Sequence, residues 1–419
     1  MKKITMSAVA LTVILGSFSS VSAANGINIF DNMKLKGEIR PRYENVDDGH
    51  AATADANAYT VRTKLSVTSD LFGMDGLTAT IGGISVNNLG SHEYNWNTSS
   101  YSDGIKPYSV VMDPQKAMIS NAEINYTFDK TILHAGRGQV NLDNQRFIGT
   151  VGWRQLERSY DSVFVANNSI TNLSVLAAWV YGFEGVKAAP TADTNTVLLH
   201  AAYSVMPELK VTAYDYMIAD AHDTYGLALT GKVNVDMAKL NYRAEYAKQK
   251  DASMNIHGGT KAKADAYYSN LDLGANVSGV LVGINYEYLS GTTGSDGKTA
   301  FATPLATGHK FNGWADKFLS TPSGGLKDFN VRLGYTAKGF GKLLAVYHTF
   351  TADKDMTAGS STSADLGSEF DAIYTNKIPN VNNLTGLLKY ANYSKGKVNN
   401  YTNDVKKIWI GLDYKFDLK

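Results

Sequence analysis

The stretch MKLKGEIRPRYE (33–44) alternates between apolar and charged residues almost throughout. Side chains two residues apart in a β-strand point to the same face, so the pattern gives one strand two different surfaces. A face made of charged residues indicates contact with water, and the opposite face needs an apolar environment. The apolar face carries Met33, Leu35, Ile39, Pro41 and Tyr43, and the charged face carries Lys34, Lys36, Glu38, Arg40, Arg42 and Glu44.

The same alternation returns along the chain as far as its last segment, KIWIGLDYKFDLK (407–419). In total about 18 segments show it, with the sixth beginning near Trp153, and most are roughly ten residues long. A tilted strand of about ten residues is long enough to cross the apolar part of a bilayer. The segments are therefore predicted to be membrane-spanning strands.

The connections between these segments alternate in length. Every second link is a tight turn, such as residues 129–130 or 278–279, whereas most of the others are long, including 139–152, 291–326 and 353–365. Short turns on one side and long loops on the other are typical of outer-membrane barrels. A soluble sandwich or a solenoid fits less well, because the strands are many and no fixed repeat appears. We predict an all-β, transmembrane antiparallel outer-membrane β-barrel of about 18 strands, with periplasmic turns and extracellular loops.

The N-terminus has the three-part layout of a secretory signal peptide. Lys2 and Lys3 precede an apolar run, which ends in small residues up to Ala23. The alternative is an N-terminal membrane anchor, but the run is too short to span a bilayer. We predict a cleaved signal peptide over 1–23, a single barrel domain over 24–419, and the outer membrane of a Gram-negative bacterium as the location.

Composition narrows the classes of function. The chain has 40 basic and 39 acidic residues and no cysteine, so nucleic acid is not an expected partner and thiolate chemistry is excluded. Its eight histidines have no metal-ligand spacing, and no nucleophile motif of the G-x-S-x-G type is present. We expect no enzyme activity, no catalytic residue, no cofactor and no resident metal ion. Weak Ca²⁺ binding by acidic loop tips, at Asp47 and Asp48 or at 295–297, stays open.

The charge on the predicted inner face indicates which ions a channel would prefer. Where the phase of a strand is clear, basic residues outnumber acidic ones two to one on this face, and rings of basic residues favour anions in pores. A mixed lumen in which the charges pair with one another is the alternative. The predicted inward basic residues are Lys34, Lys36, Arg40, Arg42, Arg62, Lys64, Lys232, Lys239, Arg243, Arg332, Lys407 and Lys415, against the acids Glu38, Glu44, Glu245, Glu287, Asp413 and Asp417.

Two loop segments are richer in charged and aromatic residues than a solvated loop requires. They are GRGQVNLDNQRFIGTVGWRQLERSYDSV (136–163) and GHKFNGWADKF (308–318). A barrel of 18 strands encloses a wide channel unless loops fold into it, so both segments are candidates for a constriction. Trp314 either stacks on a sugar ring or fastens its loop to the wall. The predicted pore-lining and constriction residues are Arg40, Arg42, Arg62, Arg137, Asp143, Asn144, Gln145, Arg146, Arg154, Arg243, Arg332, Trp314, Asp316 and Lys317.

Three segments resemble the alginate export family of outer-membrane proteins: GEIRPRYENV (37–46), LDNQRFIGTVGWRQ (142–155) and ATPLATGHKFNGWADKFLSTPSGGLKD (302–328). The resemblance implies an 18-stranded monomeric barrel with an electropositive channel and loops folded into the pore. The named member of the family exports a polyuronate. The chain departs from the usual barrel ending, since its last residues, YKFDLK, do not finish on an aromatic residue. The matching positions are Asp143, Asn144, Gln145, Arg146, Trp153, Arg154 and Gln155, followed by Phe311, Asn312, Gly313, Trp314, Ala315, Asp316 and Phe318.

Together these features predict a porin: small hydrophilic solutes, preferentially anions, diffuse through a basic lumen narrowed by loops. The first alternative is export of an anionic polysaccharide such as alginate. A surface adhesin or structural major outer-membrane protein is the second alternative, and a barrel-embedded hydrolase is the third. Expected partners are outer-membrane lipid and lipopolysaccharide, the barrel assembly machinery, and the transported solute or polysaccharide. The substrate, the direction of transport and the oligomeric state stay open.

Overall fold

The computed structural model describes residues 29–418, apart from 52, 91–92, 97–107, 188, 257–261 and 293–296. The predicted signal peptide lies outside these described residues. Within them, no helix is long and apolar enough to cross a membrane. The strands are β1 (Phe30–Asp47), β2 (Ala56–Leu71), β3 (Leu77–Asn88), β4 (Ala117–Phe128), β5 (Thr131–Gly138), β6 (Ser159–Asn167), β7 (Leu173–Glu184), β8 (Ala192–Met206), β9 (Leu209–Ile218), β10 (His222–Val235), β11 (Ala238–Lys250), β12 (Lys263–Val277), β13 (Val280–Ser290), β14 (Lys298–Thr299), β15 (Gly325–Ala337), β16 (Gly341–Ala358), β17 (Ser361–Lys377), β18 (Leu384–Ser394) and β19 (Val405–Leu418).

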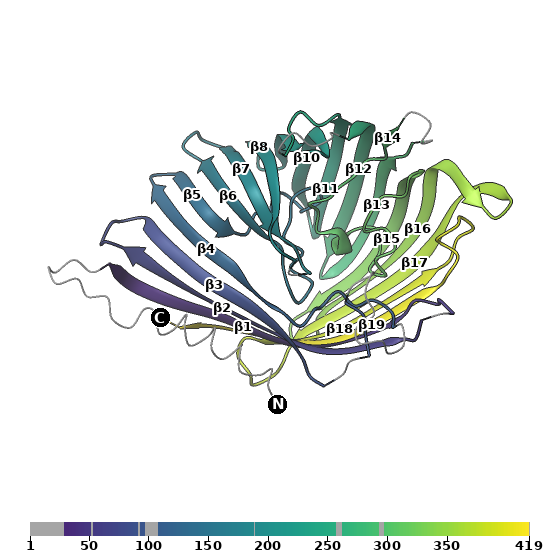
Figure 1. Ribbon diagram of the computed structural model, residues 1–419, viewed down its shortest axis with the longest axis horizontal. Helices are drawn as coiled ribbons and strands as arrows, with labels where there is room; N and C mark the ends of the chain where they lie inside the picture. Colours follow the sequence, from purple (N-terminus) through teal and green to yellow (C-terminus); the bar gives the residue numbers. More distant parts are fainter. Residues whose placement is uncertain are drawn as a thin grey trace.

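The strands close into one barrel, as Figure 1 shows. Apart from the short β14, each strand pairs antiparallel with the next along the chain, with β13 paired to β15, and β1 also pairs with β19, so that Leu35 lies opposite Leu418. The barrel has 18 strands, because the two-residue β14 only pairs in parallel with β12 beside the wall. The predicted fold class is confirmed. A short 3₁₀ helix, η2 (Gly308–Lys310), lies in the loop before β15.

The period-two pattern becomes an apolar outside and a polar inside. Ile39 and Ile124 are 41% and 51% exposed on the outer face, whereas the charged Arg42 and Arg62 on the inner face are 5% and 1% exposed. Residues directly opposite each other on paired strands share a face. Arg40 faces Arg62 across β1 and β2, and this register continues around the barrel. Every charged residue that the phase assigned to the lumen lies on this inner face.

Two predicted boundaries were wrong. The sixth strand begins at Ser159 instead of near Trp153, because residues 153–158 belong to a loop that stays inside the barrel. The predicted long link 353–365 is mostly strand. β16 and β17 extend past the rest of the wall and meet at a tight turn at Gly359, whose φ of 62° favours glycine.

Three long loops fold into the barrel. They are residues 139–158, residues 300–324, and residues 93–96 and 108–116 of the link between β3 and β4; we call these together the inner loops. Their apolar side chains pack against inward side chains of the wall. Phe147 and Phe301 meet Tyr214 and Tyr268 from β9 and β12, with ring centroids 5.3 to 5.4 Å apart for the Phe147–Tyr214, Phe147–Tyr268 and Tyr268–Phe301 pairs. A hydrophobic core thus lies inside the barrel beside the polar wall.

Candidate functional site: the inner loops and the charges that hold them

The loop 139–158 follows β5 and turns back on itself through tight bends. Asp143, Gln145 and Val151 have φ values of 48°, 67° and 57°, and the amide of Gln145 donates to the carbonyl of Leu142 at 2.8 Å. A second contact joins this loop to the loop 300–324. The amide of Gly149 donates to the carbonyl of Leu305 at 2.9 Å, and a Cβ at Gly149 would lie 2.3 Å from the Thr307 hydroxyl oxygen. The two loops therefore approach each other so closely at Gly149 that a side chain there would force a neighbour to shift.

Arg146 fastens this loop to the far wall. Its guanidinium donates to both carboxylate oxygens of Glu287 on β13, at 2.8 and 3.1 Å, and to the Asn312 side chain at 3.0 Å. Arg146 is only 3% exposed. Burial by itself would lower the pKa of the Arg146 guanidinium, but the attraction of Glu287 outweighs it, and the pKa is raised. The loop does fold inward, and the positive charge of Arg146 is paired with Glu287 on the wall.

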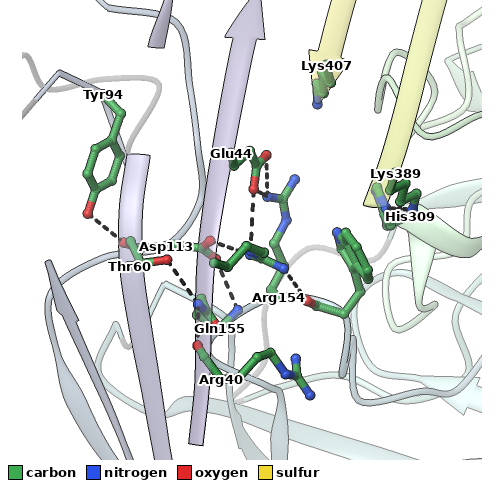
Figure 2. A network of polar contacts seen from close by, with 12 residues as sticks. Arg40, Glu44, Thr60, Tyr94, Asp113, Arg154, Gln155, His309, Lys389 and Lys407 are labelled. Atoms are coloured by element: carbon green, nitrogen blue, oxygen red, sulfur yellow. Dashed lines mark hydrogen bonds and ion pairs between the residues drawn. The ribbon is translucent and has the colours of Figure 1, made fainter. Parts of the chain in front are cut away.

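Arg154 connects two loops and one strand, and Figure 2 shows its contact with Glu44 on β1. Its guanidinium lies 3.2 Å from a carboxylate oxygen of Glu44 on β1 and 2.7 Å from one of Asp316 in the loop 300–324. Burial opposes the charge on Arg154, but Glu44 and Asp316 together raise its pKa. Asp316 also lies 2.9 Å from Lys407 and 2.6 Å from His309. Although burial opposes ionisation of Asp316, His309, Lys407 and Arg154 hold its pKa well below the usual range.

The third loop supplies a residue that the sequence reasoning missed. Asp113 is fully buried, forms an ion pair with Arg42 on β1, and accepts the backbone amide of Gln155 at 3.0 Å. Burial by itself would raise the pKa of Asp113, but the attraction of Arg42 and Arg154 outweighs burial, so the pKa is lowered. A lone aspartate in a long polar loop carries no signal of this role in the sequence. Only docking of the loop reveals it.

An aromatic cluster surrounds one buried lysine. The ammonium of Lys389 on β18 lies 4.0 Å from the ring centroids of Trp153 and Trp314, 5.1 Å from that of Trp409, and 2.6 Å from Nε2 of His309. The backbone amide of Trp314 also donates to Asp371 on β17 at 3.1 Å. Of the two interpretations of Trp314, this geometry favours the one in which the residue fastens its loop to the wall.

The other predicted inner-face arginines also have acidic partners. Arg62 lies 3.1 Å from Glu157 in the loop 139–158, and Lys64 pairs with the same carboxylate. Arg40 lies 2.6 Å from Glu38, Arg243 lies 2.7 Å from Glu245, and Arg332 lies 2.7 Å from Asp272. The self-paired lumen, which the sequence left as the alternative, is therefore what the middle of the barrel contains.

The remaining predicted loop residues are structural neighbours of these pairs. Asp143 pairs with His200 at 3.1 Å, and the Asn144 side chain accepts the amide of Arg146 at 3.1 Å. The Gln145 side chain accepts the Thr307 hydroxyl at 2.8 Å. The ammonium of Lys317 lies over the rings of Tyr393 and Tyr401, at 5.4 and 5.8 Å from their centroids, and burial lowers its pKa.

Arg137 was wrongly placed among the pore-lining candidates. It lies opposite Ala122 on β4 and Asp161 on β6, and it shares its phase with Leu133, which is 43% exposed on the outer wall. Its guanidinium binds Asp161 at 2.7 Å and Glu184 at 2.8 Å on the outer surface. β5 continues to Gly138, and the inward loop begins only after it. Arg137 therefore still follows the alternation of the strand, which turns its side chain outward.

Free positive charge remains at the end of the barrel that carries the short turns, which we call the turn end. Among the described residues, no carboxylate lies within ion-pair distance of a set of exposed inner-face lysines near these turns. Of this set, Lys210 and Lys342 were not assigned to the lumen from the sequence, and neither were the inward acids Glu123, Asp272, Asp328, Glu369 and Asp371. The lysines are Lys34, Lys36, Lys210, Lys232, Lys239 and Lys342.

Two cavities open at the turn end beneath the inner loops. One, of about 740 Å³, is lined by residues of β1–β4, β18 and β19, including Lys36, Lys64 and Glu123. The other, of about 630 Å³, lies against β6–β9 and includes His200 and Lys210.

Within the part of the chain that the structure describes, no group of three or more His, Cys, Asp or Glu residues has the arrangement of a metal site. Asp47 and Asp48 accept local backbone amides at 3.0 Å.

Comparison with known proteins supports the fold. OccAB4 of Acinetobacter baumannii is 17% identical, with a TM-score of 0.70 over 94% of this chain and 100% of that chain. OccK9 (OpdG) of Pseudomonas aeruginosa is 15% identical, with a TM-score of 0.72 over 92% and 99%. OpdK of Pseudomonas aeruginosa, solved with vanillate, is 14% identical, with a TM-score of 0.71 over 93% and 100%. No family model and no curated protein matches, so the resemblance to the alginate export family has no support from these comparisons.

Proposed function

We propose that this chain is an outer-membrane channel through which small hydrophilic solutes diffuse, with a preference for anions. The solved barrels of the same fold are outer-membrane porins of Gram-negative bacteria. The apolar outer face suits lipid, and the polar inner face suits water. No covalent step and no energy input are part of the proposal.

The unpaired lysines at the turn end carry the anion preference. The arginines around the inner loops are neutralised by carboxylates within 2.6 to 3.2 Å, so their charge has little reach. Lys34, Lys36, Lys232 and Lys239 are exposed and lie on the inner face. Uncompensated charge facing water sets the potential that a passing ion meets.

The inner loops favour small solutes over a polymer. They pack with side chains such as Phe147 and Leu305 against the wall, and the cavities that remain beneath them measure about 630 and 740 Å³. Such volumes are typical of sites for small molecules. We therefore propose diffusion of single small solutes, and no observation favours export of a polysaccharide.

Conductance in a planar lipid bilayer tests this function. We expect steady ohmic current in potassium chloride, and a reversal potential in a salt gradient that shows chloride passing more readily than potassium. The preference should weaken as the salt concentration rises, since the Debye length falls from about 10 Å at 0.1 M to about 3 Å at 1 M. A barrel that passes no current would contradict the channel and favour a surface adhesin. Current without anion preference would contradict the role of the lysines.

A further inference from the structure

The cavity of about 630 Å³ lies directly under the loop 139–158 and has the features of a solute site. Its upper side is the bend at Leu142 and Asp143, and its wall is formed by inward residues of β6, β7, β8 and β9. We call it the loop-base cavity. Its volume lies within the range of about 300–1,000 Å³ that is typical of small-molecule sites.

Positive charge in this cavity has little compensation. Lys130 and Lys210 line it, and Asp143 is the one acid among its lining residues. The carboxylate of Asp143 is already paired with Nε2 of His200 at 3.1 Å. Lys210 is exposed and has no carboxylate within ion-pair distance among the described residues. An anion entering the cavity therefore meets a free ammonium.

Residues just outside the lining add to the positive potential. The positive charges of Arg243 on β11 and of Lys210 both lower the pKa of Asp143, and Arg243 also lowers the pKa of Lys310. Burial would raise the pKa of the Asp143 carboxyl, but its hydrogen bond with His200 and these basic neighbours lower it. Lys310 reaches into the same region from the loop 300–324, where its ammonium donates to the carbonyl of Asn144 at 2.9 Å.

The remaining lining is suited to hydroxyl groups. Asn141, Asn168, Asn172, Ser174 and Ser204 supply amide and hydroxyl side chains along the cavity. An amide offers two donors and an acceptor, and a hydroxyl offers one donor and two acceptor sites, so such a lining can bind a polyol without rejecting variants of it. Leu142 and Leu176 provide apolar surface for the C–H face of a ring.

We propose that the loop-base cavity is a binding site for a polyhydroxylated organic anion of the size of one sugar, with its acidic group beside Lys210 and its hydroxyls toward the asparagines. The acidic group is a carboxylate, as in a sugar acid, or a phosphate, as in a sugar phosphate. The inference deepens the proposed function, because it places a substrate class at a defined point of the lumen.

Equilibrium binding tests the site without relying on conduction. The full-length barrel in detergent micelles is titrated with galacturonate, glucose 6-phosphate or glucose, and binding is followed by ligand-observed NMR. We expect saturable binding of at least one of the two anions and none of glucose at the same concentrations. Binding of galacturonate alone assigns the site to carboxylates, and binding of glucose 6-phosphate alone assigns it to phosphates. If neither anion binds, or if glucose binds as well as the anions, the proposal is overturned.

Two matched variants locate the site. Lys210→Gln removes an exposed ammonium from the loop-base cavity, and Lys239→Gln removes one from the inner face outside its lining. We expect Lys210→Gln to raise the dissociation constant about tenfold, as for loss of one charge-assisted contact, and Lys239→Gln to change it by less than about twofold. Equal effects of the two variants on the dissociation constant would mean that the inner-face lysines attract anions in general and that the cavity is not a specific site, which would overturn the proposal. Conductance, measured separately, reports on the channel itself, so the two proposals fail independently.

Discussion

Replacement of Arg154 by glutamine separates two roles for the arginines of the inner loops. An exposed filter arginine contributes charge to the lumen, whereas a buried arginine holds a loop in place. Arg154 is 2% exposed and has Glu44 at 3.2 Å and Asp316 at 2.7 Å. The structure therefore predicts that the variant loses stability, and that its reversal potential stays close to that of the parent protein.

The magnitude follows from the partners that Arg154 leaves behind. Removing one member of a buried ion pair costs about 3–5 kcal/mol, because the other charge stays buried without compensation. Here each acid keeps a second cation, since Arg42 lies 3.6 Å from Glu44 and Lys407 lies 2.9 Å from Asp316. We therefore expect the lower end, a loss of about 3 kcal/mol in the free energy of unfolding.

Urea unfolding of the barrel in lipid vesicles, followed by tryptophan fluorescence, measures this loss. Trp153 reports directly, because it lies next to Arg154 and stacks on His309 with ring centroids 4.9 Å apart. Arg154→Lys keeps the charge but has one ammonium in place of two separate donor groups, so it should restore only part of the stability. Lys239→Gln is the control, with a shifted reversal potential and stability within about 0.5 kcal/mol of the parent.

Arg154 does not hold the loop if Arg154→Gln unfolds at the urea concentration of the parent protein while its reversal potential shifts toward cations. That result would mean that the guanidinium faces the solute path and that Glu44 and Asp316 do not depend on it. A loss of stability together with larger current fluctuations is the expected outcome, since the loop is then held less firmly.

Four further results are expected. The depressed pKa of Asp316 implies stabilisation that is complete above the unfolded-state value of about 3.9 and is lost as pH falls through the lower folded-state pKa, so the difference in free energy of unfolding between the parent and Asp316→Asn should stay constant from pH 8 to about pH 4 and shrink only below it; a difference that already shrinks near pH 6 would disagree. Gly313→Ala should destabilise the protein by roughly 1–3 kcal/mol in urea, because Gly313 has a φ of 84° and its Cβ would lie 2.3 Å from Glu369, and a neutral result would show that the loop relaxes freely. Lys36→Glu should move the reversal potential toward cations at 0.1 M salt and much less at 1 M, whereas an equal shift at both would argue against an exposed charge. Arg137→Ala should leave the reversal potential unchanged, and any shift would place Arg137 in the lumen after all.

Local patterns were enough to predict the strands and the faces of most of them. The alternation in 33–44 correctly separates Ile39, which faces outward, from Arg40 and Arg42, which face inward. The pattern failed for Arg137, because the residue was grouped with a loop although it continues the phase of β5. It also failed at residues 153–158, WRQLER, where Trp153 and Leu156 pack inside the barrel although the mixture of apolar and charged residues resembles a strand in the sequence.

The sequence by itself determined the barrel, because a period of two is a local property of the chain. Segments of about ten alternating residues can cross a membrane as the strands of a closed barrel. The sequence also determined that charges face inward on the strands whose phase is clear. Only the tertiary structure decided what those charges do. Arg146 meets Glu287 across 141 residues of chain, and Arg154 meets Glu44 across 110, through loops whose path no local pattern encodes. The physical reason is that an ion pair depends on distance in space and not on separation along the chain. Once the inner loops dock, the arginines that were predicted to form a filter are paired with acids and hold those loops in place.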